Sequence, residues 1–251
     1  EGIGAAEARA TALPGRRVRA EGLLPGTEDP FVLAADELTV GAESVRATRV
    51  ELELGTPLVP IGSRARPVAA RLATSRLFAD LLTVAPTETV LQGGVLVETQ
   101  DLEGVPVQLE AQLLRLGTQD LQDVETVTLD SLKAVDAEGA VRLRYGDGAV
   151  VEASALRMDA QRLRVTGNPV VLESMGYEVR TDLVELDLTD FLLELDAGTV
   201  TSGPGWGLRF AGVLPHRMGG DLLQTMHGVT FEVQGQTARA NHAAFWLHPG
   251  R

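Results

Sequence analysis

The fold is decided by one stretch near the middle of the chain: Val141-Arg142-Leu143-Arg144-Tyr145, then Gly146-Asp147-Gly148, then Val150-Val151. Apolar and charged residues alternate before the turn, so one face of the segment is apolar and the other is charged. Successive side chains of a β-strand point to opposite faces, and Gly-Asp-Gly is typical of a tight turn. This stretch therefore predicts two antiparallel strands with one face against a core and one face in water.

The same alternation continues on both sides of this stretch, for example in Val50–Leu54, Tyr177–Arg180 and Val229–Val233. Turn-forming residues separate such runs at short intervals: Gly167-Asn168-Pro169, Ala197-Gly198-Thr199 and Ser202-Gly203-Pro204-Gly205. With 27 glycines and 12 prolines, the chain is typical of many short strands joined by tight turns. We expect an all-β protein, with Thr74–Val84 as one of its strands and only Ala5–Ala10 as a short helix or frayed end.

A weak internal repeat runs through the second half of the chain. A glycine followed by a β-branched run recurs at Gly139, Gly167, Gly198 and Gly228, at spacings of 28, 31 and 30 residues. Gly94 resembles an earlier member, but its distance of 45 residues from Gly139 breaks the register. A period near 30 residues indicates stacked β units, each too small to bury its own apolar face, although chance recurrence in a glycine-rich chain is the alternative.

Composition excludes several classes of function. There are 22 basic and 35 acidic residues, a formal net charge of −13, which disfavours binding to nucleic acid or to an anionic membrane surface by bulk charge. The absence of cysteine removes thiol nucleophiles, thiolate metal sites and disulfides. No apolar run is long enough to span a bilayer. Glu1-Gly2-Ile3-Gly4 lacks the features of a signal sequence, so we expect any leader or anchor to lie outside this chain.

The chain divides into two parts by its punctuation. Thr56–Pro67 contains Pro57, Pro60, Gly62 and Pro67 and reads as a loop. We therefore expect an irregular N-terminal segment with some strands over residues 1–67, and a regular β domain over residues 68–251.

From about Val141 to Gly203 the chain resembles the bridge proteins of lipopolysaccharide transport, the OstA-like β-jellyroll family. The resemblance rests on a succession of strand phrases: 141–145, 150–159, 163–172 and 176–186. Its most specific piece is Thr166-Gly167-Asn168-Pro169-Val170. The likeness covers about a quarter of the chain well, and residues 74–233 loosely; the first seventy residues match no family that we can name.

The resemblance implies an antiparallel β-jellyroll, a V-shaped pair of stacked sheets that encloses an apolar groove. It implies a periplasmic protein that holds the acyl chains of lipopolysaccharide or another acylated lipid, and that joins other β-jellyroll proteins or further copies of itself through its sheet edges. The residues implied for the groove are Val141, Leu143, Val151, Leu163, Val165, Val170, Leu172, Val179 and Leu193. The residues implied for the lipid head group are Arg142, Arg144, Arg157, Arg162 and Arg164.

The residues taken alone leave a second interpretation open. A core of Leu, Val, Ala and Met suits flexible acyl chains, but the same side chains can pack against each other as a closed core. The arginines can likewise be an ordinary solvated strand face. The alternative function is therefore a structural β scaffold of a cell-envelope assembly.

We find no constellation that predicts an enzyme, a cofactor or a metal site. The chain contains no nucleophile elbow, P-loop or dinucleotide-binding motif. The four histidines, His216, His227, His242 and His248, fall in the last 36 residues but lack the helical i, i+4 spacing of a zinc site, so we expect exposed loop or edge-strand positions. The acidic run from Glu185 to Asp196 alternates with leucine and lacks the pattern of a calcium loop, which favours a polar strand face.

Large aromatic residues gather near the C-terminus: Trp206, Phe210, Phe245 and Trp246. The run Ala243-Ala244-Phe245-Trp246-Leu247 is predicted to be a terminal strand. It can either close one end of the core or serve as a docking strand for a partner.

Overall fold

The computed structural model describes residues 8–23, 30–41, 44–56, 73–85, 88–100, 104–118, 132–159, 161–187, 192–218 and 221–247. These residues form 18 β-strands and no helix, and every strand pairing given for them is antiparallel. The all-β, antiparallel class predicted from the alternation is confirmed. The predicted strand Thr74–Val84 is also confirmed, as part of β6.

Two compact units make up the chain, Glu1–Ala137 and Glu138–Arg251, and the division falls inside strand β9 (Leu132–Tyr145). The expected boundary at residue 67 lies outside the described residues. The expected short helix Ala5–Ala10 is wrong where it is described, because residues 8–10 lie in strand β1 (Ala8–Thr11); residues 5–7 lie outside the described residues. The strands of the N-terminal unit are β1 (Ala8–Thr11), β2 (Val18–Leu23), β3 (Pro30–Ala35), β4 (Glu37–Val40), β5 (Val45–Thr56), β6 (Ala73–Ala85), β7 (Glu88–Gln100) and β8 (Pro106–Thr118).

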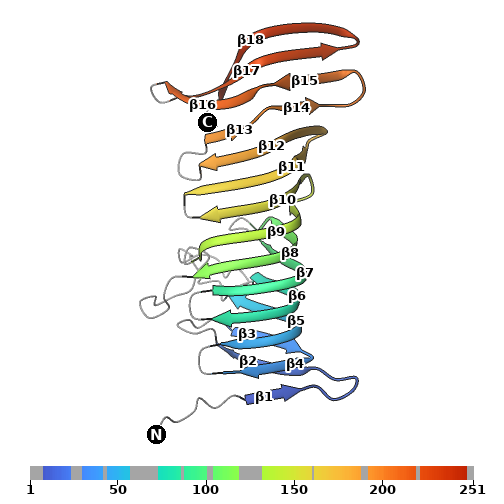
Figure 1. The fold of residues 1–251 in the computed structure, drawn as a ribbon, viewed down its shortest axis with the longest axis vertical. Helices are drawn as coiled ribbons and strands as arrows, with labels where there is room; N and C mark the ends of the chain where they lie inside the picture. Colours follow the sequence, from blue (N-terminus) through green and yellow to red (C-terminus); the bar gives the residue numbers. More distant parts are fainter. Residues whose placement is uncertain are drawn as a thin grey trace, which may run out of the picture. The chain divides into compact units, whose positions relative to one another are not determined.

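The N-terminal unit is a meander in which most strands pair with their neighbours in the chain (Figure 1). β5 pairs with β6, β6 with β7 and β7 with β8, each along most of its length. β3 and β4 lie end to end against successive halves of β5, while β2 pairs with β3 and β1 with β4. Two short strands therefore take the place of one long strand.

The C-terminal unit repeats this arrangement. Its strands after β9 are β10 (Ala149–Asp159), β11 (Arg162–Ser174), β12 (Tyr177–Asp187), β13 (Leu192–Leu195), β14 (Gly198–Thr201), β15 (Trp206–Phe210), β16 (Gly212–Met218), β17 (Asp221–Val233) and β18 (Gln236–Leu247). β13 and β14 lie end to end against β12, and β15 and β16 lie end to end against β17. The terminal strand predicted around Ala243–Leu247 is confirmed as the end of β18, the last strand in this unit.

A crease runs across the strands of each unit. The pairing shifts register at Gln92/Val95 in β7, at Glu152/Ala155 in β10 and at Thr166/Val170 in β11. At the same level in other strands, the backbone has positive φ at Arg49, Ala140 and Gly228. Extra residues and left-handed backbone bend a strand locally. The two halves of each strand therefore form two arms on either side of the crease.

The crease explains the glycine repeat. Gly139, Gly167 and Gly228 lie on it in β9, β11 and β17, and Gly198 lies directly beside it at the start of β14. Gly94 occupies the crease in β7. A period of about 30 residues is therefore two strands, one out and one back, and the longer interval from Gly94 to Gly139 contains residues 119–131, which lie outside the described residues.

Two predicted turns are wrong for the same reason. Ala197-Gly198-Thr199 lies where β13 continues into β14 along the same partner strand, β12, so the chain does not reverse there. Gly167-Asn168-Pro169 lies inside β11, where the strand bends at the crease, and not between two strands. Glycine, asparagine and proline suit a bend as well as a reversal of the chain. The predicted turns at Gly146–Gly148 and Ser202–Gly205 do join strands, β9 to β10 and β14 to β15.

The core consists of the side chains nearest the crease. In the N-terminal unit these buried residues include many small ones: Ala35, Ala47, Ala79 and Ala111. Larger ones, such as Leu82, Leu91 and Leu114, complete the layer. A flat sheet has no second layer to bury its side chains, so the bend supplies it, and small residues let the two arms approach each other.

Candidate functional site

The C-terminal unit contains all the residues predicted for the groove and the head-group site. We call its two halves arm A and arm B. Arm A comprises residues 155–159, 162–166, 183–187, 192–195, 212–218, 221–227 and 242–247. Arm B comprises residues 141–145, 149–152, 170–174, 177–181, 198–201, 206–210, 229–233 and 236–240.

A first apolar row in each arm lies next to the crease and is closed. In arm A, Leu156, Val165, Val184, Leu195 and Val213 stand opposite one another on successive strands. In arm B the row is Val170, Thr181, Gly198 and Phe210. Apart from Leu195 and Gly198, these residues are buried. The first rows are therefore a packed core.

The polar member of this core has its hydrogen bond satisfied. Thr181 Oγ1 donates to the backbone oxygens of Leu183 and Asp196, both at 3.2 Å. Asp196 lies at the crease between β13 and β14, so this hydroxyl ties the crease of β12 to that of the next strand. A buried hydroxyl without such partners would be costly.

A second apolar row in each arm lies farther from the crease on the same face. In arm B, Val151, Leu172, Val179, Val200, Leu208 and Phe231 stand opposite one another from β10 to β17. In arm A, the row is Met158, Leu163, Leu186 and Leu193. Every one of these side chains is only half-buried. The second rows are thus two apolar strips that the opposite arm does not fully cover.

The predicted groove residues divide between these rows. Val165 and Val170 belong to the first rows, and Val141 is equally buried. Val151, Leu163, Leu172, Val179 and Leu193 belong to the second rows, and Leu143 is half-buried like them. Sequence analysis missed Val200, Leu208 and Phe231 of arm B and Met158 and Leu186 of arm A. Val200 and Phe231 each lie between polar residues in an alternating run, which is the signal that would have found them.

Aromatic residues mark the end of arm B that is farthest from the crease. Trp206 contacts Tyr177 and Phe231 edge to face, with ring centroids 5.9 and 5.5 Å apart. Tyr145 and Tyr177 are about half exposed, and Met175 in the turn between β11 and β12 is almost fully exposed. The outer end of the second row is therefore bordered by apolar groups in contact with water. Phe210 lies in the core, and the side chains of Phe245 and Trp246 lie outside the described ones.

The five arginines predicted for a head group alternate with the inward-facing residues of their strands and therefore lie on the outer face. Arg142 and Arg144 are in arm B, whereas Arg157, Arg162 and Arg164 are in arm A, so the structure does not bring the five together. Arg142 Nε lies 3.4 Å from Glu152, and Arg164 Nε lies 3.3 Å from Glu185, on the neighbouring strands. The backbone N–H of Arg162 donates to Asp159 at 2.8 Å.

Asp159 closes the turn between β10 and β11. Its Oδ1 accepts hydrogen bonds from the backbone N–H groups of Gln161 and Arg162, both at 2.8 Å. These two hydrogen bonds hold the pKa of the Asp159 carboxyl below its ordinary value, because they favour the charged form. The bond from Gln161 has the larger effect on the pKa. The carboxylate therefore has a structural task in this turn.

His227 and His242 are directly opposite each other on β17 and β18, with ring centroids 4.8 Å apart. His242 is exposed on the last strand, as expected for an edge-strand histidine. For His227 the expectation of an exposed loop or edge position is wrong, because it is half-buried on β17, between β16 and β18. The side chain of His216 and all of His248 lie outside the described part of the chain. Among the described residues, no group of three or more His, Asp or Glu side chains is arranged to hold a metal ion.

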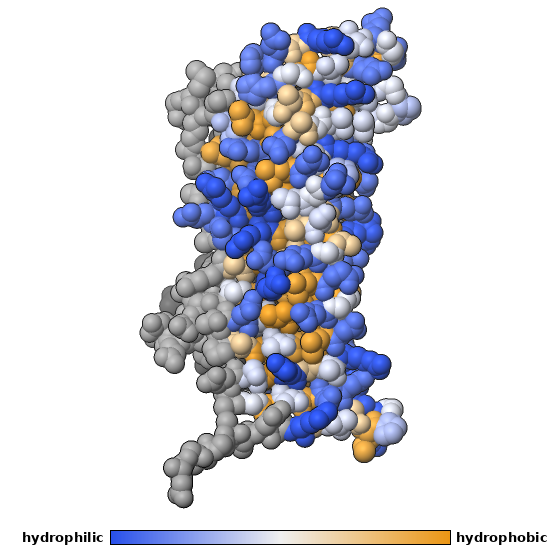
Figure 2. All heavy atoms as spheres, viewed as in Figure 1, coloured by the Kyte–Doolittle hydropathy of each residue, from blue (hydrophilic) through white to orange (hydrophobic). Residues whose placement is uncertain are grey.

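On the face shown in Figure 2, apolar side chains appear in patches along the strands of each unit, between charged side chains. No helix within the described ranges is long and apolar enough to cross a membrane. No protein-family model and no curated protein matches this chain.

Proposed function

We propose that this protein is a periplasmic lipid-binding protein of the kind that bridges membranes in lipopolysaccharide transport. In this proposal the second rows of the C-terminal unit hold the acyl chains of lipopolysaccharide or another acylated lipid. The sheet edges join it to other β-jellyroll proteins or to further copies of itself. The fold supports the class of architecture, and the resemblance of residues 141–203 supplies the function.

One observation carries the proposal: the second row of arm B is continuous and half-buried. Val151, Leu172, Val179, Val200 and Leu208 are cross-strand neighbours, so their apolar surface is one strip and not scattered residues. Isolated apolar residues on a surface are ordinary, whereas a contiguous strip bordered by polar residues indicates a binding surface. Aliphatic side chains fit flexible acyl chains without fixing one orientation.

The edge-to-edge assembly has support in β18. This strand is 12 residues long and is the last of its unit. It contains neither the lysine nor the proline that commonly protects an edge strand. Such an edge can accept a further strand by backbone hydrogen bonding.

The decisive experiment compares the same substitution on the two faces of neighbouring strands. Val179→Asp places a carboxylate in the second row, whereas Val171→Asp places one on the outer face, where Val171 is also half-buried. Each purified protein is incubated with lipid A and examined by native mass spectrometry. We expect the natural chain and Val171→Asp to carry the lipid and Val179→Asp to lose it, because an ionised group in an apolar site is strongly disfavoured.

Val165→Asp is unsuitable for this experiment. Val165 is only 3% exposed, so a carboxylate there would unfold the core whatever the protein binds. Circular dichroism of Val179→Asp and Val171→Asp shows whether both are folded before lipid is added. If the natural chain carries no lipid, or if both variants carry it equally, the lipid function is wrong and the closed first rows favour the structural scaffold.

A further inference from the structure

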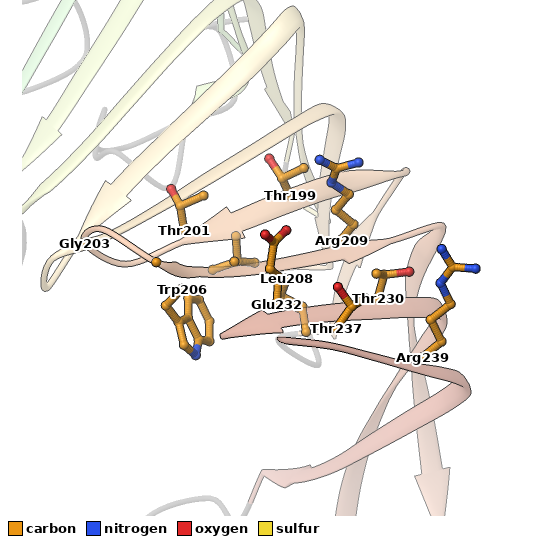
Figure 3. A pocket seen from close by; sticks show the side chains of 13 residues that line it. Thr199, Thr201, Gly203, Trp206, Leu208, Arg209, Thr230, Glu232, Thr237 and Arg239 are labelled. Carbon is orange, nitrogen blue, oxygen red and sulfur yellow. The ribbon is translucent and has the colours of Figure 1, made fainter. Parts of the chain in front are cut away.

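A depression of about 540 Å³ lies on the outer face of arm B, where the strand alternation places the side chains opposite to those of the apolar strip; besides polar residues, its lining includes Val200, Trp206 and Leu208. It is formed by two complete cross-strand rows on β14, β15, β17 and β18. We call them the arginine row, which is Thr199, Arg209, Thr230 and Arg239, and the glutamate row, which is Thr201, Gly207, Glu232 and Thr237. Figure 3 shows these side chains on one side of the strands and Trp206 pointing to the other.

In the arginine row and its continuation onto β12, no arginine stands directly opposite another. Arg180 on β12 stands opposite Thr199, which stands opposite Arg209, and Thr230 separates Arg209 from Arg239. Two strand spacings, about 10 Å, therefore separate consecutive arginines along the row. Like charges directly opposite would be destabilising, and the intervening threonines avoid this cost.

Two of these arginines are available to a ligand. Arg180 is bonded to Glu178 at 2.5 Å, and this contact lowers the pKa of the Glu178 carboxyl. By contrast, Arg209 and Arg239 are exposed and have no ion pair among the described residues. In a chain of net charge −13, it is unusual that one depression holds two cations that form no ion pair with any described carboxylate, Glu232 of the same depression included.

The other groups in the depression restrict the class of ligand. Four threonine hydroxyls can donate and accept hydrogen bonds, and Glu232 can only accept while it is ionised. Gly207, in the middle of the glutamate row, has no side chain, so the backbone forms the floor of the depression there. A bare inorganic anion would fill little of this volume and would be repelled by Glu232. A nucleic acid would be repelled by the whole molecule.

We propose that this depression binds an anionic saccharide. The acidic groups of the sugar pair with Arg209 and Arg239, while its hydroxyls bond to the threonines and to Glu232. Guanidinium groups bind carboxylates and phosphates by paired hydrogen bonds, which suits both kinds of acidic sugar. The site does not depend on lipid binding, because it uses the opposite face of the sheet.

Isothermal titration of the full chain with trigalacturonate at low ionic strength tests this inference. Neutral maltotriose serves as the uncharged probe. We expect saturable binding of trigalacturonate that Arg209→Gln or Arg239→Gln each weakens about tenfold or more, since each removes a charge-assisted contact. Arg164→Gln is the matched control: it removes an arginine from the outer face of arm A and leaves the affinity unchanged. All three positions are exposed, so the variants retain the fold.

A second arm identifies the source of the sugar. Phosphatidylcholine vesicles with and without a sialic-acid ganglioside present the same chemistry on a membrane. Binding to the ganglioside vesicles that is lost in Arg209→Gln/Arg239→Gln assigns a lipid head group, whereas binding of trigalacturonate alone assigns a free saccharide. The inference is overturned if neither probe binds, if maltotriose binds as tightly as trigalacturonate, or if the double variant binds as the natural chain does.

Discussion

At the scale of single residues, the crease depends on positions where no side chain fits. Gly198 begins β14 beside the crease. A Cβ at this position would lie 2.3 Å from the carbonyl oxygen of Arg180 and 2.8 Å from the ring of Phe210. Phe210 is in the buried first row, so the glycine lets this ring lie directly against the backbone. The repeat glycine is therefore a packing requirement at this position.

Gly198→Ala should destabilise the C-terminal unit by about 2–3 kcal/mol, because neither the backbone carbonyl nor the buried ring can move without disturbing the core. Urea denaturation followed by circular dichroism measures this loss. Gly148→Ala is the control, since a Cβ there meets nothing within 4 Å and the residue lies in an exposed turn. Equal stability of the two variants would show that the crease has room that the structure does not display.

Sequence alternation predicted the face of each residue but not its distance from the crease. Val165 and Leu163 have the same face, the same strand and the same chemistry, yet one is in the closed core and the other is half-buried. The difference depends on where the strand bends, and that depends on the register of neighbouring strands. The five arginines predicted for a head group do not form one cluster for the same reason. Arg144 and Arg157, for example, are close in sequence but lie in different arms.

At the scale of strands, the type of the elements and their antiparallel pairing could be predicted well. Antiparallel pairs joined by short turns need only local sequence, and most strands here pair with their neighbours in the chain. The bends could not be distinguished from the turns: Gly167-Asn168-Pro169 has the same composition as a hairpin turn. The 30-residue period is the sequence signal that distinguishes the bends from the turns, since a period of two strands places a glycine at the same level in every second strand.

The connection between β1 and β2 crosses the crease of the N-terminal unit and is held there by Arg17. Its guanidinium bonds to the carboxylate of Glu51 at 3.0 Å, to the backbone oxygen of Ala34 at 2.9 Å and to that of Arg49. Asp36 lies within 4.0 Å of it and accepts a further bond from Arg49 at 3.0 Å. One side chain thus joins the connection before β2 to strands β3 and β5.

Arg17→Ala should release this connection while the rest of the unit remains folded. We expect faster amide hydrogen exchange in β1 and β2 and little change in β6 and β7, with a loss of about 1–2 kcal/mol in local stability. Arg19→Ala is the matched control, because among the described residues Arg19 pairs with Glu21 of its own strand alone, and both are well exposed. An equal increase of the exchange rate in all strands of the unit after Arg17→Ala would contradict this local role.

At the scale of the whole molecule, the net charge of −13 opposes the compact state. Most exposed ion pairs, such as Arg76 with Glu53 and Arg164 with Glu185, neutralise single carboxylates, and each contributes little to stability. The remaining negative charges repel one another more strongly in the folded chain than in the expanded one. Because of the same excess, Arg209 and Arg239 of arm B, which form no ion pair within the described ranges, are a local exception to the charge of the molecule.

Raising the salt concentration should therefore have opposite effects on stability and on sugar binding. Between about 20 mM and 300 mM NaCl the screening length falls to less than half, which weakens the repulsion between carboxylates and also the attraction of Arg209 and Arg239 for an anion. We expect the thermal midpoint at pH 7 to rise and the affinity for trigalacturonate to fall. KCl at equal ionic strength should reproduce both changes, because screening does not depend on the identity of the cation. A midpoint that falls with salt would show that attractive ion pairs, and not the excess of negative charge, dominate the electrostatics of this fold.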